Sequence, residues 1–136
     1  MSTIIKVRGY HIDVFQHVNN GRYLEFMEAA RWDLFSDSDT LQWLNNNKVA
    51  FIVANININY RHPAVLGDEL EVHSSMQELR NKSGTFFQKI IRKGDNRVIA
   101  DALSTFVCVD LKTQQTLVLE GELRERLNEF KNETVK

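Results

Sequence analysis

Residues 13–34, DVFQHVNNGRYLEFMEAARWDL, join a short polar loop to an amphipathic helix, and this junction organises the fold. Apolar side chains recur at offsets of three, four, seven and eleven residues, which places them on one helix face. They are Tyr23, Phe26, Met27, Ala30 and Leu34. Asn19 or Asn20 is a favourable N-cap. The free N–H groups of the first helical turn therefore lie next to the loop, where they can bind developing negative charge.

Most of the remaining chain has the pattern of strands. Residues 49–53 are continuously apolar and predict a strand buried on both faces, whereas residues 55–59 alternate as a strand buried on one face does. Further strands are expected at 3–7, 70–76, 85–91, 98–110 and 116–119, with a hairpin turn at 94–96. A short second helix is expected over 38–44, and a closing amphipathic helix is marked by Leu119, Leu123, Leu127 and Phe130.

One long helix against one strongly curved antiparallel sheet of five to six strands is an α+β fold. A single helix can cover only one face of such a sheet, so the other face and the edge strands need a second cover. A second copy of the chain is the simplest cover, and we expect a homodimer or a homotetramer.

Composition and charge narrow the class of protein. The 136 residues and 43% hydrophobic content suit a single domain over residues 1–136. A formal net charge of −1 argues against nucleic acid or an acidic membrane as the main partner. No signal peptide is visible and no apolar stretch reaches the ~20 residues of a membrane helix, so we expect a cytoplasmic protein without stable membrane insertion. The single cysteine, Cys108, suits a reducing compartment and is expected to fill a core position.

The loop and the helix start carry the candidate catalytic groups. Asp13 can act as a nucleophile or a general base, or it can simply form an Asx-turn. His17 can orient the carboxylate, bond to a substrate carbonyl or carry a proton, or it can bond only to the backbone. The N–H of Asn20 or Gly21 can polarise an ester or thioester carbonyl, and Gly21 permits close approach. Spacing alone favours the structural alternative for both Asp13 and His17.

Candidate phosphate-binding groups lie farther along the chain. Arg61 and His62 follow the apolar strand, and Lys82 and Ser83 lie in the next turn; each can also be a solvated turn residue. No His, Cys, Asp or Glu group has the spacing of metal ligands, so no metal is expected. A Gly-x-Ser-x-Gly nucleophile motif is absent as well.

The pattern D-x-x-x-H-V-N-N-x-x-Y-x-x-x-x-E-x-A-R over residues 13–31 resembles the signature of hotdog-fold acyl-CoA thioesterases of the 4-hydroxybenzoyl-CoA thioesterase type. The segments NYRHPA (59–64) and GDEL (67–70) resemble the same family's second strand and turn, and the likeness covers the whole chain. Within that family, the chain most resembles the bacterial long-chain acyl-CoA thioesterases III.

The resemblance implies a hotdog fold, dimers or tetramers, and an active site near the subunit interface. It implies that Asp13 attacks the thioester or activates a water, and that the N–H of Asn20 or Gly21 polarises the carbonyl. The role of His17 does not carry over from the aryl-specific or short-chain relatives, which have tyrosine or histidine where this chain has Asn20. Plant acyl-carrier-protein thioesterases share the His-Val-Asn-Asn loop but have asparagine where Phe15 stands.

Together these observations predict hydrolysis of medium- to long-chain fatty acyl-CoA, with no cofactor beyond the coenzyme A of the substrate. The expected catalytic residues are Asp13, His17, Asn20 and Gly21, and the expected substrate-binding residues are Tyr23, Arg61, Lys82 and Ser83. An apolar groove for the acyl chain would draw on Tyr23, Phe26 and Met27. The alternatives on the same fold are an acyl-carrier-protein thioesterase, an aryl-CoA thioesterase and a non-catalytic acyl-CoA-binding module.

Overall fold

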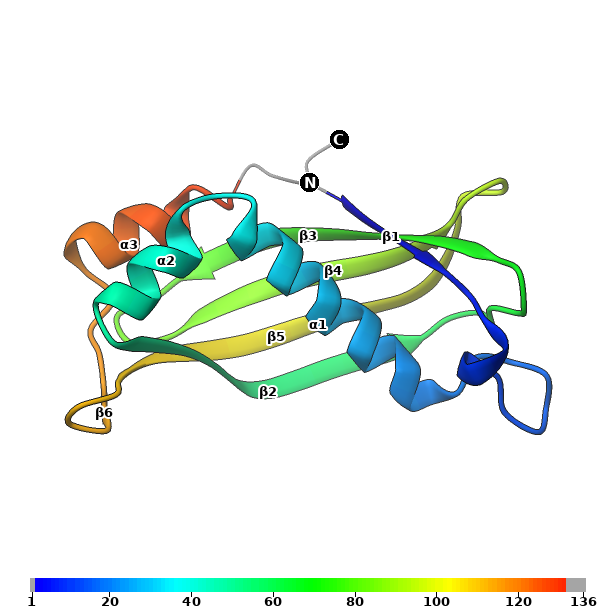
Figure 1. The fold of residues 1–136 in the computed structure, drawn as a ribbon, viewed down its shortest axis with the longest axis horizontal. Helices are drawn as coiled ribbons and strands as arrows, with labels where there is room; N and C mark the ends of the chain where they lie inside the picture. The colour runs from blue at the N-terminus through cyan, green and yellow to red at the C-terminus, as the bar shows by residue number, and fades with distance from the viewer. Residues whose placement is uncertain (1, 132–136) are drawn as a thin grey trace.

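A computed structural model describes residues 2–131 and shows a curved antiparallel sheet wrapped around one long helix (Figure 1). The strands are β1 (Ser2–Lys6), β2 (Val49–Tyr60), β3 (Glu69–Leu79), β4 (Gly84–Arg92), β5 (Arg97–Asp110) and β6 (Gln115–Thr116). The helices are α1 (Asn20–Ser36), α2 (Thr40–Asn46) and α3 (Gly121–Asn128), and a 3-10 helix spans Gly9–His11. The predicted α+β hotdog fold is confirmed.

The strand order in the sheet is β1-β3-β4-β5-β2, with β6 paired to β5 outside this path. Every pairing is antiparallel. The predicted hairpin turn joins β4 to β5, and its Gly94 and Asn96 have left-handed backbone, with φ of 105° and 57°. β1 and β2 are thus the two edges of the main sheet.

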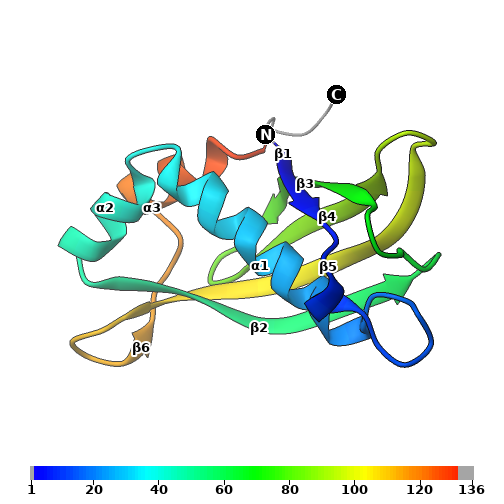
Figure 2. The same cartoon turned by 45° about the vertical axis from the view of Figure 1, so that its right-hand side comes forward.

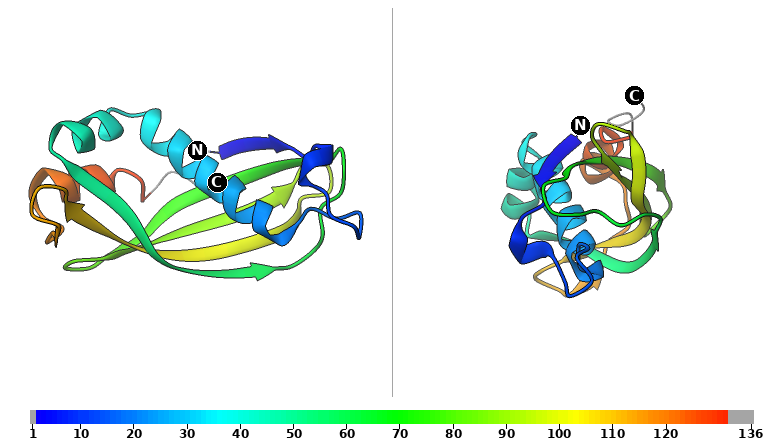
Figure 3. Two further views of the ribbon diagram at one scale, coloured as in Figure 1. Left: turned by 60° about the horizontal axis from the view of Figure 1, so that its bottom comes forward. Right: turned by 90° about the vertical axis from the view of Figure 1, so that its right-hand side faces the viewer.

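Helix α1 lies across the concave face of the sheet, as the two turned views show (Figures 2 and 3). Its predicted apolar stripe is confirmed, because all five stripe residues are buried. The helix is also tied to the sheet by the fully buried Gln88, whose Nε2 donates to the carbonyl oxygen of Met27 (2.9 Å) and to Oγ of Ser74 (3.0 Å). No helix among residues 2–131 is long and apolar enough to cross a membrane.

A second core cluster fills the end of the sheet beneath α2 and α3. The four apolar residues that predicted the closing helix are all buried there: Leu119, Leu123, Leu127 and Phe130. Cys108 belongs to the same cluster and is completely buried, as predicted, and its burial raises the pKa of the thiol to about 12. A thiol with so high a pKa stays protonated at neutral pH and is a poor nucleophile.

Three predicted elements differ from the structure. The apolar segment 49–53 was expected to be buried on both faces, but it begins an edge strand, and its Ile52 side chain is 43% exposed. The second helix begins at Thr40 and not at residue 38, because the Ser38 hydroxyl accepts a hydrogen bond from the N–H of Thr40 (3.2 Å). The last strand is only two residues long, since the chain then turns to the β3–β4 connection, where the N–H of Leu119 donates to the carbonyl oxygen of Asn81 (2.7 Å).

Candidate active site

The loop before α1 is a tight hairpin that displays Asp13. Ile12 and Val18 form an isolated antiparallel bridge, and the N–H of Asp13 donates to the carbonyl oxygen of His17 (2.9 Å). Gln16 closes the turn with a left-handed backbone (φ 66°). A further hydrogen bond, from the N–H of Val18 to the carbonyl oxygen of Ala64 (2.9 Å), fastens this hairpin to the segment that follows β2.

The Asp13 carboxylate is oriented by the turn that it helps to form. Its Oδ1 accepts from the N–H of Phe15 (2.9 Å) and, at a longer distance, from the N–H of His17 (3.4 Å). Among the described residues, Oδ2 has no hydrogen-bond partner. The Asx-turn that the sequence offered as the structural alternative is therefore present, and it leaves one carboxylate oxygen available for chemistry.

The two candidate oxyanion donors at the start of α1 differ in whether their N–H group is already hydrogen-bonded. Asn19 is the N-cap, and its side-chain oxygen accepts from the N–H of Gly21 (2.9 Å). The N–H of Asn20 has no partner among residues 2–131, so it is one of the unsatisfied donors of the first helical turn. Gly21 lies in a neighbouring shallow depression with Tyr10 and Arg22, outside the cleft that contains Asp13. Asn20 is therefore the better placed of the two donors.

A cleft of about 670 Å³ brings together residues that are far apart in the sequence. The predicted residues Asp13, His17, Asn20, Tyr23 and Arg61 all line it. Residues that the sequence did not assign to the site also line it, namely Phe15, Val18, Asn19, Tyr60 and Pro63. Tyr60 could have been found from the alternation of β2, because it continues the inward-facing series of Ile56 and Ile58.

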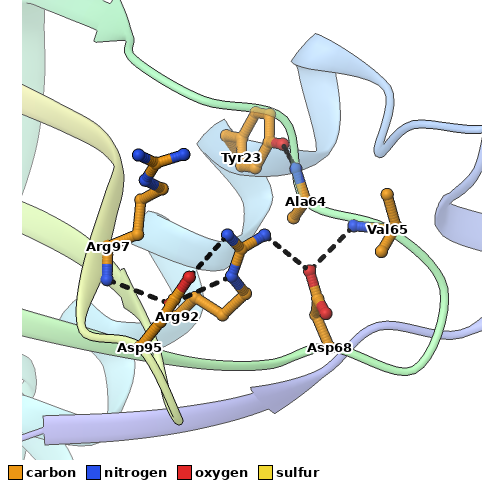
Figure 4. A network of polar contacts seen from close by, with 7 residues as sticks. All are labelled: Tyr23, Ala64, Val65, Asp68, Arg92, Asp95 and Arg97. Atoms are coloured by element: carbon orange, nitrogen blue, oxygen red, sulfur yellow. Dashed lines mark hydrogen bonds and ion pairs between the residues drawn. The ribbon is translucent and has the colours of Figure 1, made fainter.

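Tyr23 supports one wall of this cleft. Its hydroxyl accepts a hydrogen bond from the N–H of Ala64 (3.1 Å; Figure 4). The centre of its ring lies 5.8 Å from that of Tyr60. Burial raises the pKa of Tyr23, so its hydroxyl stays protonated. Tyr23 therefore positions the 61–68 segment against α1.

Asp68 and Arg92 fix the other end of the same segment. Asp68 Oδ2 accepts from the N–H of Val65 (3.0 Å) and from Nη1 of Arg92 (3.4 Å) (Figure 4). Arg92 also binds both carboxylate oxygens of Asp95, at 3.1 and 2.8 Å, and this pairing lowers the pKa of Asp95 to about 2. The cleft wall is thus anchored to the β4–β5 hairpin.

The predicted phosphate-binding residues have different surroundings. Arg61 lines the cleft, but its guanidinium group donates to both oxygens of Asp101, at 2.9 and 3.2 Å. Lys82 and Ser83 lie outside the cleft, in the β3–β4 turn at the opposite end of the sheet (Figure 1). There the Ser83 hydroxyl accepts from Nε of Arg80 (3.0 Å). Within one protomer, Lys82 and Ser83 therefore do not reach Asp13.

We expect Tyr23→Phe to lower the free energy of unfolding by about 1–3 kcal/mol, because the buried N–H of Ala64 would lose its acceptor. Urea denaturation of the two proteins measures the difference. Tyr10→Phe is a suitable control, since Tyr10 is 72% exposed and its substitution should leave stability unchanged. Equal stability of Tyr23→Phe and wild type would show that the hydroxyl does not hold the cleft wall.

This arrangement suits attack on an activated carbonyl. A carboxylate with a free oxygen can attack the carbonyl carbon or remove a proton from water. An unpaired N–H at a helix N-terminus can stabilise the negative charge that then develops on the carbonyl oxygen. A carboxylate and an unpaired N–H in one cleft are therefore the kinds of group that acyl transfer requires.

Comparison with known proteins agrees with this chemistry. Residues 7–127 match the family model of the thioesterase-like superfamily. The chain is 60% identical to the long-chain acyl-CoA thioesterase FadM of Escherichia coli K12 over 130 residues, which are 96% of this chain and 98% of the relative. It is 32% identical over 94 residues to the acyl-CoA thioester hydrolase YbgC of E. coli O6:H1, covering 68% and 69% of the two chains.

A solved structure shows the same fold. The crystal structure of YbaW, a probable thioesterase from E. coli, superposes with a TM-score of 0.91 at 59% identity and covers 96% of this chain and 98% of that one. The two chains therefore have the same arrangement of helix and sheet.

Proposed function

This chain belongs to the thioesterase-like superfamily, and from that membership we propose that it is an acyl-CoA thioesterase, a hydrolase that converts medium- to long-chain fatty acyl-CoA to free fatty acid and coenzyme A. The observation that carries the proposal is the presence of the Asp13 carboxylate and the unpaired N–H of Asn20 in one cleft. The name of the E. coli K12 relative supports a long-chain substrate.

In the proposed reaction, Asp13 either removes a proton from a water that attacks the thioester carbonyl carbon, or attacks that carbon itself. In the second case the acyl group is transferred to Asp13 as a mixed anhydride, which water then hydrolyses to the fatty acid and the free carboxylate. The carbonyl oxygen becomes an oxyanion, which the N–H of Asn20 and the N-terminal dipole of α1 stabilise. The carbon–sulfur bond then breaks, and coenzyme A leaves as the thiol after taking up a proton. His17 lines the same cleft and is exposed, and we propose that it orients the water or the carbonyl.

The reaction consumes only water, so the proposal requires no metal and no organic cofactor. Arg61 is the proposed contact of the coenzyme A phosphates at the rim, where it would share its guanidinium between substrate and Asp101. Lys82 and Ser83 can contribute only across a subunit interface, given their distance from the cleft within one protomer.

We propose a homodimer as the minimum assembly, from which a homotetramer can form. The outer edge of β2 has no neighbouring strand within residues 2–131, and this edge is 12 residues long. A long unpaired edge is a ready template for another strand. Antiparallel pairing of β2 with β2 of a second copy would form a two-fold interface and place the two α1 helices side by side.

The compartment and domain organisation complete the proposal. We place the enzyme in the cytoplasm, where its single buried thiol, Cys108, remains reduced. The family match over residues 7–127 supports one domain for the chain.

A carrier-protein thioesterase is the main competing function. Carrier proteins are acidic, so docking would favour free cations near the cleft. Three of the cations in this region are instead paired: Arg61 with Asp101, Arg92 with Asp68 and Asp95, and Lys93 with Glu69. This pairing disfavours docking of an acidic carrier protein over a wide surface, whereas acyl-CoA would need only the shared contact of Arg61 proposed above.

The proposed function is tested by comparing kcat/KM for a fatty acyl-CoA, for the same fatty acyl group on an acyl carrier protein, and for an aryl-CoA thioester. We expect the fatty acyl-CoA to be the best substrate. A preference for the carrier protein or the aryl thioester would replace the proposal with that alternative, and binding without turnover of any substrate would identify a non-catalytic module.

A further inference from the structure

A second cavity lies at the other end of α1 from the Asp13 cleft. It has a volume of about 500 Å³ and lies between the C-terminal half of α1, helix α2 and the first residues of β2. Its apolar walls include Trp32, Phe35, Leu41, Leu44, Val53 and Leu111. We call this space the distal cavity.

The catalytic cleft is charged and polar around the proposed reacting groups. Polar side chains supply much of its lining, among them Asp13, His17, Asn20 and Arg61. The sequence suggested a groove along Phe26 and Met27, but both are buried in the core under α1, so that expectation is wrong. The apolar walls of the distal cavity therefore match the hydrocarbon end of an acyl chain better than the charged centre of the cleft does.

One face of α1 leads from the cleft to the distal cavity. At 100° per residue, Asn20, Leu24, Glu28, Arg31 and Phe35 fall on a single stripe along the helix. Asn20 lines the cleft, and the last three line the distal cavity. Leu24 lies between the two spaces and is 37% exposed in one protomer, so it presents an apolar surface along this path. In the proposed dimer, α1 of the second copy would form the outer wall of the path.

The length of this path suits a long acyl chain. With a rise of ~1.5 Å per residue, Asn20 and Trp32 are separated by roughly 18 Å along the helix axis. An extended long-chain acyl group covers such a span and a short-chain group does not. The distal cavity would therefore be reached only by long substrates.

The two charged residues of the distal cavity have partners beside it. Nη1 of Arg31 donates to Oε1 of the buried Gln88 (3.1 Å), and Oε2 of Glu28 accepts from Nε1 of Trp32 (3.4 Å). These contacts hold the charged ends, and the arginine stem and the indole ring can then cover apolar surface. The charges therefore do not prevent a hydrocarbon chain from occupying the cavity.

We propose that the distal cavity binds the end of the acyl chain and sets the preferred chain length. This inference rests on the proposed acyl-CoA thioesterase function. Burial of the hydrocarbon chain against the apolar walls supplies the recognition.

The inference predicts that Val53→Phe, which adds a ring inside the cavity, lowers the ratio of kcat/KM for palmitoyl-CoA to kcat/KM for hexanoyl-CoA at least tenfold. Val118→Phe is the matched control, because Val118 is exposed and lies outside the cavity, and we expect it to leave the ratio within twofold of wild type. An unchanged ratio in a folded Val53→Phe protein would contradict the inference.

Photolabelling of the wild-type protein tests the same inference without turnover. A long-chain fatty acid with a diazirine at its methyl end should label peptides that contain residues 28–35 or 41–53. Labelling confined to the loop at Phe15 would overturn the inference. Labelling of the cavity in a protein that hydrolyses no acyl-CoA would support the binding site and reject the proposed function, so the two failures are distinguishable.

Discussion

Asp13→Asn is expected to lower kcat/KM for palmitoyl-CoA by about 10²–10⁴-fold, the contribution typical of a general base, and by more if Asp13 is the nucleophile. The amide can neither attack the carbonyl nor accept a proton from water. Release of the coenzyme A thiol measures the effect. A matched control is Asp37→Asn, at an exposed residue just after α1, which should leave the rate within twofold of wild type.

Substitution by asparagine removes the reactive carboxylate but keeps the hydrogen bonds that hold the loop. Its side-chain oxygen can still accept from the N–H groups of Phe15 and His17, which hold the loop in the wild-type protein. We therefore expect an unchanged Tm for Asp13→Asn, while Asp13→Ala also loses the Asx-turn. Activity of Asp13→Asn within threefold of wild type would remove Asp13 from the mechanism.

Leu24→Glu is expected to weaken dimerisation by at least about 10²-fold, because two uncompensated carboxylates would face each other across the proposed two-fold axis. Leu24 lies on the α1 face that antiparallel pairing of β2 edges would bury. Sedimentation velocity over a range of concentrations measures the change. Glutamate is a good helix former, and Leu24 is already 37% exposed, so the single chain should keep its fold.

Leu66→Glu provides the comparison. Leu66 is 63% exposed and lies in the segment between β2 and β3, beyond the end of the β2 edge that the proposed pairing would use. We expect this variant to sediment as the wild type does. If Leu24→Glu also remains dimeric at the same concentrations, α1 is not part of the subunit interface and the pairing of β2 edges must be rejected.

Periodicity predicted the parts of the fold that are decided locally. The stripe from Tyr23 to Leu34 defines α1, and the Asn19 cap fixes where it begins. The buried face of a helix follows from spacing of three and four residues, whatever it packs against. The same reasoning found the closing helix from four apolar residues.

Sheet position could not be predicted in this way. Residues 49–53 have the apolar composition of a central strand, yet β2 lies at the edge. Strand order depends on pairings between distant segments, and an edge strand that meets a partner subunit has the same composition as a buried one. The apolar pattern of β2 is therefore best explained by the proposed dimer.

The sequence predicted several residues that the structure brings into one cleft, but not the contacts that each of them makes. Asp13, His17 and Asn20 lie close in sequence, and the structure places them in one cleft with Arg61. The side chain of Asn19 determines which backbone N–H remains free, because its oxygen accepts the hydrogen bond of the Gly21 N–H. The position of Lys82 and Ser83 depends on which way the β3–β4 hairpin extends, and neighbouring residues do not determine that direction.

Thiol release from palmitoyl-CoA, measured for purified wild type and Asp13→Asn side by side, tests the central claim most directly. We predict steady turnover by the wild type and a loss of at least about 10²-fold in the variant, with both proteins folded and both binding the substrate. Tight binding of palmitoyl-CoA by the wild type without thiol release, or equal turnover by the two proteins, would contradict the claim that Asp13 makes this chain an acyl-CoA thioesterase.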